Sequence, residues 1–123
     1  MLRKILLGFG ILIGIPALYI GFVFWDICVR DGIVGASWRG DVAEIKRWRL
    51  VGANVSQVGW ESHDTPLTAA ARQGNLKAVT YLLETGANPT IENDFHETPL
   101  KLATGRNDTA MIALLKAHLA RRK

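Results

Sequence analysis

The sequence has little cysteine, little proline and no surplus of one charge outside its two ends. One Cys among 123 residues cannot form an internal disulfide, which excludes a disulfide-stapled scaffold. Four Pro and 12 Gly are too few for a collagen-like or low-complexity chain. The net charge of +4 is less than the charge of the terminal basic residues alone, which are Arg3, Lys4, Arg121, Arg122 and Lys123. A duplex-binding protein needs clustered basic residues on its folded part, so we expect no nucleic-acid partner.

Long apolar runs are also absent, with one exception. Residues 5–25, from Ile5 to Trp25, contain no charged side chain. At about 1.5 Å per residue, 21 helical residues reach about 31 Å, which is enough to cross a bilayer. A cleaved signal peptide is the alternative, but the run ends in bulky Phe24 and Trp25 rather than in the small residues of a cleavage site. We therefore predict an uncleaved signal-anchor transmembrane helix at residues 1–25, followed by a juxtamembrane linker at 26–30.

The charges that flank this run predict its orientation. Arg3 and Lys4 lie close together on the N-terminal side, whereas residues 26–40 on the other side offer only Arg30 and Arg39. The positive-inside tendency then predicts a single-pass protein with a cytoplasmic N-terminus and an exported, periplasmic remainder. A stripe of small residues inside the run predicts close packing with a second copy of the helix, a homo-oligomer contact through Gly10, Gly14, Ala17 and Gly21.

The rest of the chain is built from an internal repeat. Thr65-Pro66-Leu67 recurs 33 residues later as Thr98-Pro99-Leu100, and Gly86-Ala87-Asn88 repeats Gly52-Ala53-Asn54 at an offset of 34. Three units fit this period, at about 31–63, 64–96 and 97–123.

The middle unit predicts helix, turn, helix and long loop. Thr65 before Pro66 is typical of a helix N-terminus, and Gly74 is typical of a helix end. Asn75 should cap a second helix at 76–84, and Gly86 should stop it. One such unit cannot bury its own apolar face, so neighbouring units must stack.

These motifs resemble the ankyrin-repeat family. The first unit departs from the family pattern because it has Asp31-Gly32-Ile33 in place of Thr-Pro-Leu, and the third has Asn107 where the middle unit has Gly74. The resemblance implies an all-α fold, with the N-terminal transmembrane helix followed by an α-solenoid of about three ankyrin-like helix-turn-helix repeats at 31–123. Trp48, which aligns with Leu82, should belong to the core.

The resemblance also implies a binding surface made of inner-helix ends and loop fingers. Trp, Phe and Arg are enriched at interface hot spots, although Trp60 and Phe95 could equally pack between adjacent fingers. We expect Arg72→Ala to weaken partner binding at least about tenfold with little effect on folding. The predicted protein-binding residues are Trp38, Arg39, Trp60, Glu61, Asp64, Arg72, Gln73, Asp94, Phe95, Glu97 and Arg106.

Catalytic patterns are weak. Ser62-His63-Asp64 holds the residue types of a hydrolytic triad, but consecutive residues cannot place the His ring between the other two side chains. His63 and His96 are 33 residues apart and could approach each other around a metal, although local hydrogen bonds of turn residues are the favoured interpretation. We expect no enzyme activity, no cofactor and no metal.

Together these features predict a membrane-tethered protein–protein interaction module that binds a protein partner through the ankyrin groove and fingers. An immunity or accessory factor for an exported protein is one concrete version. The alternative is a self-associating structural scaffold at the membrane.

Overall fold

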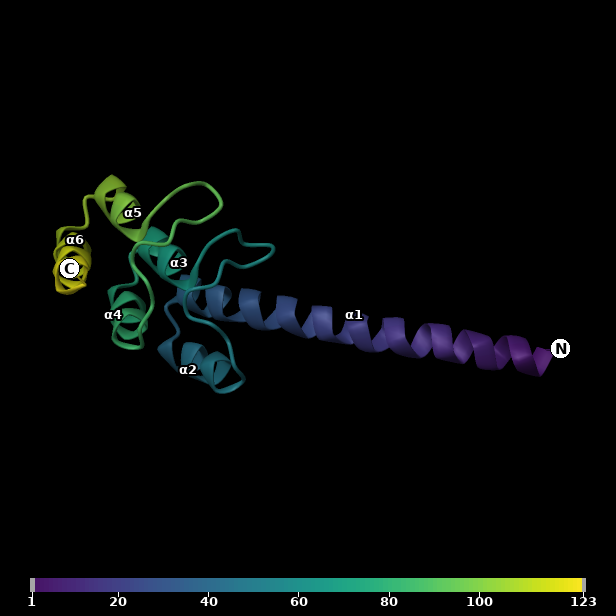
Figure 1. Cartoon of the computed structure of the whole chain (residues 1–123). Coiled ribbons are helices and arrows are strands. Elements are labelled where there is room, and N and C mark those ends of the chain that lie inside the picture. Colours follow the sequence, from purple (N-terminus) through teal and green to yellow (C-terminus); the bar gives the residue numbers. More distant parts are fainter. Residues whose placement is uncertain (1, 123) are drawn as a thin grey trace.

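The protein folds as one long helix with pairs of short helices stacked at its C-terminal end (Figure 1). The computed structural model describes residues 2–122, with side chains described from residue 17 to residue 122. Over that range it contains helices and no strand, in agreement with the predicted all-α class. The helices are α1 (Leu2–Arg39), α2 (Val42–Leu50), α3 (Pro66–Gln73), α4 (Leu76–Glu84), α5 (Pro99–Gly105) and α6 (Thr109–Arg121).

Helix α1 runs without a break into the first repeat. The segment 26–30, which we expected to be a linker, is helical, and Arg30 pairs there with Asp26 at 2.9 Å, one helical turn away. Val29 is already buried, together with Ile33 and Val34 on the same side. The C-terminal half of α1 is therefore the inner helix of the first unit, and packing begins slightly before residue 31.

The predicted membrane-spanning run lies mainly outside the described side chains. Residues 5–16 belong to that undescribed part, as do Gly10 and Gly14 of the small-residue stripe. In the described part of the chain, no helix is both long enough and apolar enough to cross a membrane. The side chains of residues 17–25 are exposed, and no side chain or chain segment lies within 4 Å of the position where Gly21 would carry a Cβ.

The middle unit has the local structure that its sequence predicts. The Thr65 hydroxyl accepts a hydrogen bond from the Thr68 backbone N–H at the start of α3, and Gly74 ends α3 with φ of 72°, a conformation that costs glycine little. Asn75 occupies the N-cap position of α4, but its side chain makes no capping bond there. Its Nδ2 donates instead to the Trp38 carbonyl oxygen at 2.6 Å, which ties α4 to the end of α1.

Stacking produces two rows of helices. The inner row is α1, α3 and α5, and each inner helix packs against its outer partner α2, α4 or α6. Ala69, Ala70 and Ala71 of α3 are fully buried between the neighbouring helices; their small side chains allow a close approach. Trp48 of α2 packs partly buried against this core, as expected. In the third unit Asn107 adopts φ of 55° in place of a glycine, a conformation that Asn tolerates better than most residues.

Two long loops project from the ends of the units along α1 (Figure 1). We call residues 55–64 the first finger and residues 88–97 the second finger. His63 and His96, near the end of each, have positive φ values of 57° and 58°. The Asp94 N–H donates to the His63 carbonyl oxygen at 3.0 Å, so the two fingers lie side by side.

Candidate protein-binding surface

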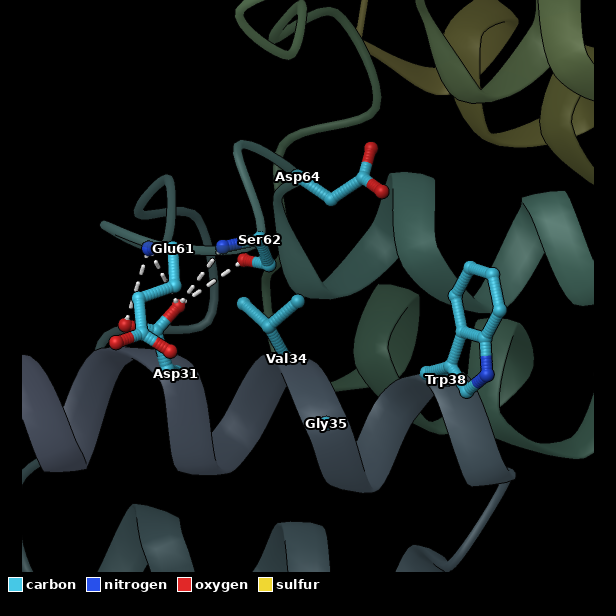
Figure 2. A pocket seen from close by; sticks show the side chains of 7 residues that line it. All are labelled: Asp31, Val34, Gly35, Trp38, Glu61, Ser62 and Asp64. Carbon is cyan, nitrogen blue, oxygen red and sulfur yellow. Dashed lines mark hydrogen bonds between the residues drawn. The ribbon is translucent and has the colours of Figure 1, made fainter.

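The first finger is held against α1 by one carboxylate. Asp31 Oδ1 accepts hydrogen bonds from the backbone N–H groups of Glu61 at 3.2 Å and Ser62 at 3.3 Å, and from Ser62 Oγ at 3.1 Å. Figure 2 shows these bonds converging on the Asp31 side chain. The finger is therefore fixed in place before any partner arrives.

An acidic hollow lies between this finger and α1. It encloses about 380 Å³ and is lined by Asp31, Val34, Gly35, Trp38, Glu61, Ser62 and Asp64. Three of these residues are carboxylates, whereas none carries a positive charge. The Trp38 ring stands beside α3 on the side of α1 that faces Asp64 (Figure 2), and the residue is 45% exposed. The hollow thus offers an accessible aromatic face next to acidic groups.

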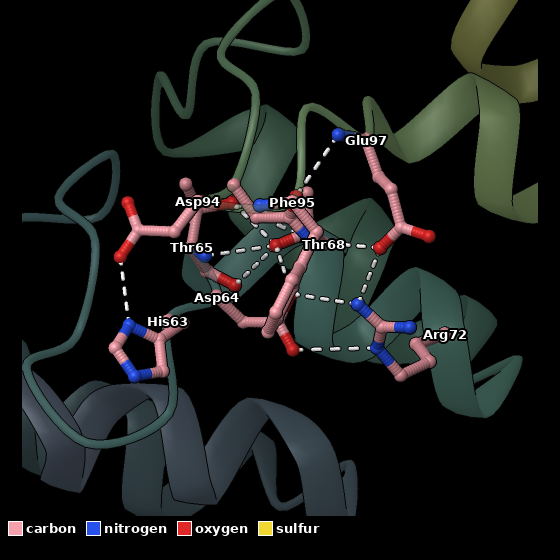
Figure 3. A network of polar contacts seen from close by, with 9 residues as sticks. His63, Asp64, Thr65, Thr68, Arg72, Asp94, Phe95 and Glu97 are labelled. Carbon is pink, nitrogen blue, oxygen red and sulfur yellow. Dashed lines mark hydrogen bonds and ion pairs between the residues drawn. The ribbon is translucent and has the colours of Figure 1, made fainter.

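A polar network joins the second and third units around Asp64 (Figure 3). Asp64 is only 6% exposed. Its Oδ1 accepts hydrogen bonds from Thr68 Oγ1 at 3.0 Å, from Arg72 Nη2 at 3.1 Å and from Asn93 Nδ2 at 2.8 Å. These donors compensate the burial of the carboxylate, which would otherwise be costly.

Arg72 extends this network to the third unit. Its Nη2 also pairs with Glu97 Oε2 at 2.7 Å. Hydrogen bonds to Asp64, and secondarily to Glu97, raise the pKa of Arg72 despite its partial burial. Asn93 Nδ2 donates to Glu97 Oε2 at 2.9 Å, and this bond, followed by the one from Arg72, lowers the pKa of Glu97.

The network changes what we expect of Arg72. Three predicted binding residues, Asp64, Arg72 and Glu97, satisfy one another inside the protein. Removing the Arg72 side chain would leave the buried Asp64 carboxylate without its cation. The expectation that Arg72→Ala has little effect on folding therefore does not agree with this geometry. Arg72, a basic residue at the end of an inner helix, thus pairs with acidic residues of the fingers inside this protein.

A basic hollow lies further along the inner row. It encloses about 410 Å³ and is lined by Arg72, Glu97, Lys101, Leu102, Gly105 and Arg106. Arg106 is exposed and donates from Nη1 to the Arg72 carbonyl oxygen at 3.0 Å. Gln73 is exposed on the neighbouring end of α3. The groove, which we define as the two hollows together with Gln73, therefore changes from acidic to basic from the first unit to the third.

The finger tips carry exposed aromatic rings. Phe95 is 59% exposed, and its ring meets the His63 ring edge-on with 5.9 Å between the centroids. Trp60 is 58% exposed, and the Arg30 guanidinium lies 5.5 Å from its ring centroid. Each ring therefore contacts a neighbouring side chain and still presents most of its surface, and the binding role of both residues stays a prediction.

Each of the two finger histidines lies beside one carboxylate, His63 across the fingers and His96 within its own finger. His63 Nδ1 lies 2.8 Å from Asp94 Oδ2, and His96 Nδ1 lies 3.3 Å from Glu92 Oε2. Among the described residues, no group of three potential ligands is placed to hold a metal ion. Arg39, the remaining predicted basic residue, pairs with Glu44 in the first turn of α2.

Sequence reasoning missed the residues that fix the fingers. Asp31, Thr68 and Asn93 hold the two fingers and the start of α3, yet none was among the predicted site residues. A signal was present, since Asp31, Asp64 and Glu97 lie 33 residues apart and mark the same position in each unit. The predicted site residues also lacked Arg30 and Lys101, although Lys101 aligns with Thr68 directly after the repeated Thr-Pro-Leu motif.

Comparison with known proteins agrees with this architecture. The family model for ankyrin repeats (3 copies) matches residues 34–122. A putative ankyrin repeat-containing protein of Treponema pallidum is 37% identical over 67 residues, which are 54% of this chain and 22% of that protein.

Two enzymes also share part of their sequence with the chain. L-asparaginase of Dirofilaria immitis is 31% identical over 63% of this chain and 13% of the enzyme. The mitochondrial liver isoform of glutaminase from Mus musculus is 29% identical over 66% and 14%. The chain thus spans less than a quarter of the length of each of these relatives, and such a short match agrees with shared repeats rather than a shared catalytic domain. With its repeats, its stacking and its match to the family model, the chain belongs to the ankyrin-repeat family.

Proposed function

We propose that the protein is a membrane-tethered module that binds a protein partner through its groove and its second finger. Ankyrin repeats generally mediate protein–protein interaction. The observation that supports this surface is the exposure of Trp38 and Phe95, the latter on a finger whose backbone is held by hydrogen bonds to Asn93. Rigid, exposed aromatics cost little entropy on binding and are frequent interface anchors.

The charge distribution indicates the partner's chemistry. A Lys or Arg side chain of the partner fits the acidic hollow, where it meets the Glu61 carboxylate and the face of Trp38. An Asp or Glu further along fits the basic hollow beside Lys101 and Arg106. The groove therefore favours a segment with a basic residue facing the first unit and an acidic one facing the third.

The apolar run supports the tether. Ile5 to Trp25 is long enough to cross a bilayer as a helix, and the flanking charges favour export of the repeats. In a bacterium the groove would then meet periplasmic proteins, as an accessory or immunity factor for an exported protein would. A phosphatase reporter fused after Lys123 should be active, and activity only of a cytoplasmic reporter would reverse the orientation.

Site-specific photo-crosslinking in the full chain tests the binding surface. A photoreactive amino acid at Trp38 or Gln73 should form an adduct with one protein of defined mass. The same amino acid at Lys77, which is exposed on the outer helix α4, is the matched control and should not.

The pattern of adducts separates the two functions that we considered. Adducts at Lys77 but not at the groove positions would contradict the groove assignment. Adducts with the mass of two copies of this chain would favour the self-associating scaffold instead.

A further inference from the structure

Two apolar tips project from the repeat domain in addition to the groove. One is the C-terminal end of α2, where Leu50 is 87% exposed and Val51 is 48% exposed. The other is Trp60 in the first finger, also largely exposed. We call Leu50, Val51 and Trp60 the tip residues. Exposed apolar side chains that gather at one end of a domain call for a covering surface.

Both tips lie beside the same short part of α1. Val51 and Trp48 share a hollow of about 360 Å³ with Trp25, the last residue of the apolar run. Trp60 lies against Arg30, which pairs with Asp26. In Figure 1 the C-terminal end of α2 and the first finger both extend from the repeats toward the N-terminal end of α1.

The spacing along α1 matches the thickness of a lipid headgroup layer. Arg30 follows Trp25 by five residues, which is about 7.5 Å of helix rise. The headgroup region on each side of a bilayer is roughly 5–8 Å thick. If the hydrocarbon boundary lies at Trp25, the level of Trp60 and Val51 falls in the headgroup layer, where Trp side chains are enriched.

The charges near the tips fit an anionic surface. Arg47 lines the same hollow as Trp25 and Val51, whereas Lys46 and Arg49 are directed to Tyr81 of α4, whose hydroxyl accepts a hydrogen bond from Arg49 Nη1 at 3.0 Å. Of the nearby acids, Asp26 is paired with Arg30 and Glu44 with Arg39, and Glu61 beside Trp60 is exposed. The end of α2 therefore presents one basic side chain, Arg47, beside exposed apolar ones, a combination that favours anionic membrane interfaces.

We propose that the tip residues insert into the headgroup layer of the bilayer that holds α1, with Arg47 against anionic phospholipid. The repeat domain then rests on the membrane at two points, which fixes the direction in which the groove faces. This inference rests on the proposed membrane tether, because without it the tips have no adjacent bilayer.

The test uses the full chain in vesicles, with Cys28→Ser as the background and one dye-labelled cysteine at a time. Tyr19→Cys reports on the tether, Leu50→Cys and Trp60→Cys on the tips, and Glu84→Cys on an exposed position of α4. Lipids with a spin label near the headgroup should quench the dye at Leu50 and Trp60, and aqueous iodide should not. The dye at Glu84 should show the reverse.

Three outcomes would overturn the inference. Lipid quenching at position 19 without quenching at positions 50 and 60 would support the tether but contradict the insertion of the tip residues. An absence of lipid quenching at Tyr19 would remove the tether itself. Shielding of Leu50 from both lipid and iodide would show that protein covers the tips.

A charge variant tests the lipid chemistry. Arg47→Gln should reduce quenching at Leu50 in vesicles that contain phosphatidylglycerol. It should have little effect in vesicles of phosphatidylcholine alone. Lys77→Gln, at an exposed position of α4, removes the same charge elsewhere and should leave the quenching unchanged. Equal effects of the two variants would contradict a specific role for the end of α2.

Discussion

At the scale of single residues, Arg72 connects the second and third units through two carboxylates. Its guanidinium reaches Asp64 at the start of its own unit and Glu97 at the start of the next. The Asp64 side chain is nearly buried and that of Arg72 is partly exposed. The burial of this ion pair is therefore intermediate between that of a surface pair and that of a fully buried pair. Breaking a buried pair costs about 3–5 kcal/mol, whereas an exposed pair contributes about 0–1 kcal/mol.

We therefore predict that Arg72→Ala lowers the free energy of unfolding by about 2 kcal/mol. Urea titration of the full chain, followed by tryptophan fluorescence, measures the change. Arg72→Lys keeps the charge but not the planar fork and should lose less. Lys77→Ala should stay within about 0.5 kcal/mol of the wild type. An Arg72→Ala variant as stable as Lys77→Ala would show that the network contributes nothing.

Glu97 gives the network a pH dependence. Asn93 and Arg72 hold the pKa of Glu97 below its ordinary value of about 4.5. Because the folded pKa is the lower one, the carboxylate stabilises the fold above the unfolded pKa, and this stabilisation is lost as the pH falls through the folded pKa.

The unfolding free energy should therefore decline below about pH 4.5, and more steeply in the wild type than in Glu97→Gln. Urea midpoints measured through this range test the sign. Glu92→Gln, on the exposed part of the same finger, should follow the wild type. If the urea midpoints of the wild type and Glu97→Gln depend on pH in the same way, Glu97 does not contribute to the pH dependence of stability.

At the scale of helices and fingers, two glycines near the groove differ in their backbone conformation: one has the positive φ that favours glycine, and the other does not. Gly74 has φ of 72°, and a Cβ there would lie 2.8 Å from Arg106 Nη2. Gly105 ends α5 with no positive φ, and the position of its Cβ is open.

Gly74→Ala should destabilise the protein by about 1–2 kcal/mol, whereas Gly105→Ala should be neutral or stabilise it by up to about 1 kcal/mol. Thermal unfolding compares the two directly. If both substitutions shift the unfolding temperature in the same direction, the left-handed turn after α3 is not what Gly74 supplies.

The elements that the sequence predicted well are those set by local chemistry. Thr65 before Pro66 starts α3 and Gly74 ends it because both effects depend on residues within one helical turn. The repeat spacing then predicted the pairing of helices, since each unit has the same apolar face to cover. The continuity of α1 through residues 26–30 was not predicted, because a change from apolar to charged residues does not itself stop a helix.

The roles of the charged residues were harder to predict. Arg72 and Glu97 were correctly placed on an inner-helix end and on a finger, but the sequence did not indicate that the finger reaches the arginine. That contact depends on how tightly successive units stack, to which Ala69 of α3 and Asn93 of the second finger both contribute. The carboxylates at Asp31, Asp64 and Glu97 share one position of the period, and a repeated acid of this kind indicates an internal structural role.

At the scale of the whole molecule, our account joins an apolar helix to a small stack of repeats with a charged, aromatic groove. The groove changes from acidic to basic along the inner row. The tips of α2 and of the first finger lie at the end nearest the apolar run. In the proposed tethered form, a partner would meet a surface whose distance from the membrane is set by helix α1.

The most direct test of the binding surface is the affinity of the crosslinked partner for the full chain and for Trp38→Ala. Trp38 forms the exposed aromatic face of the acidic hollow and takes no part in the Arg72 network, so its loss should affect binding more than folding. We predict that Trp38→Ala weakens binding at least about tenfold, or about 1.4 kcal/mol, while Lys77→Ala binds as the wild type does. Wild-type affinity in Trp38→Ala, or an equal loss in Lys77→Ala, would contradict the assignment of the groove as the binding surface.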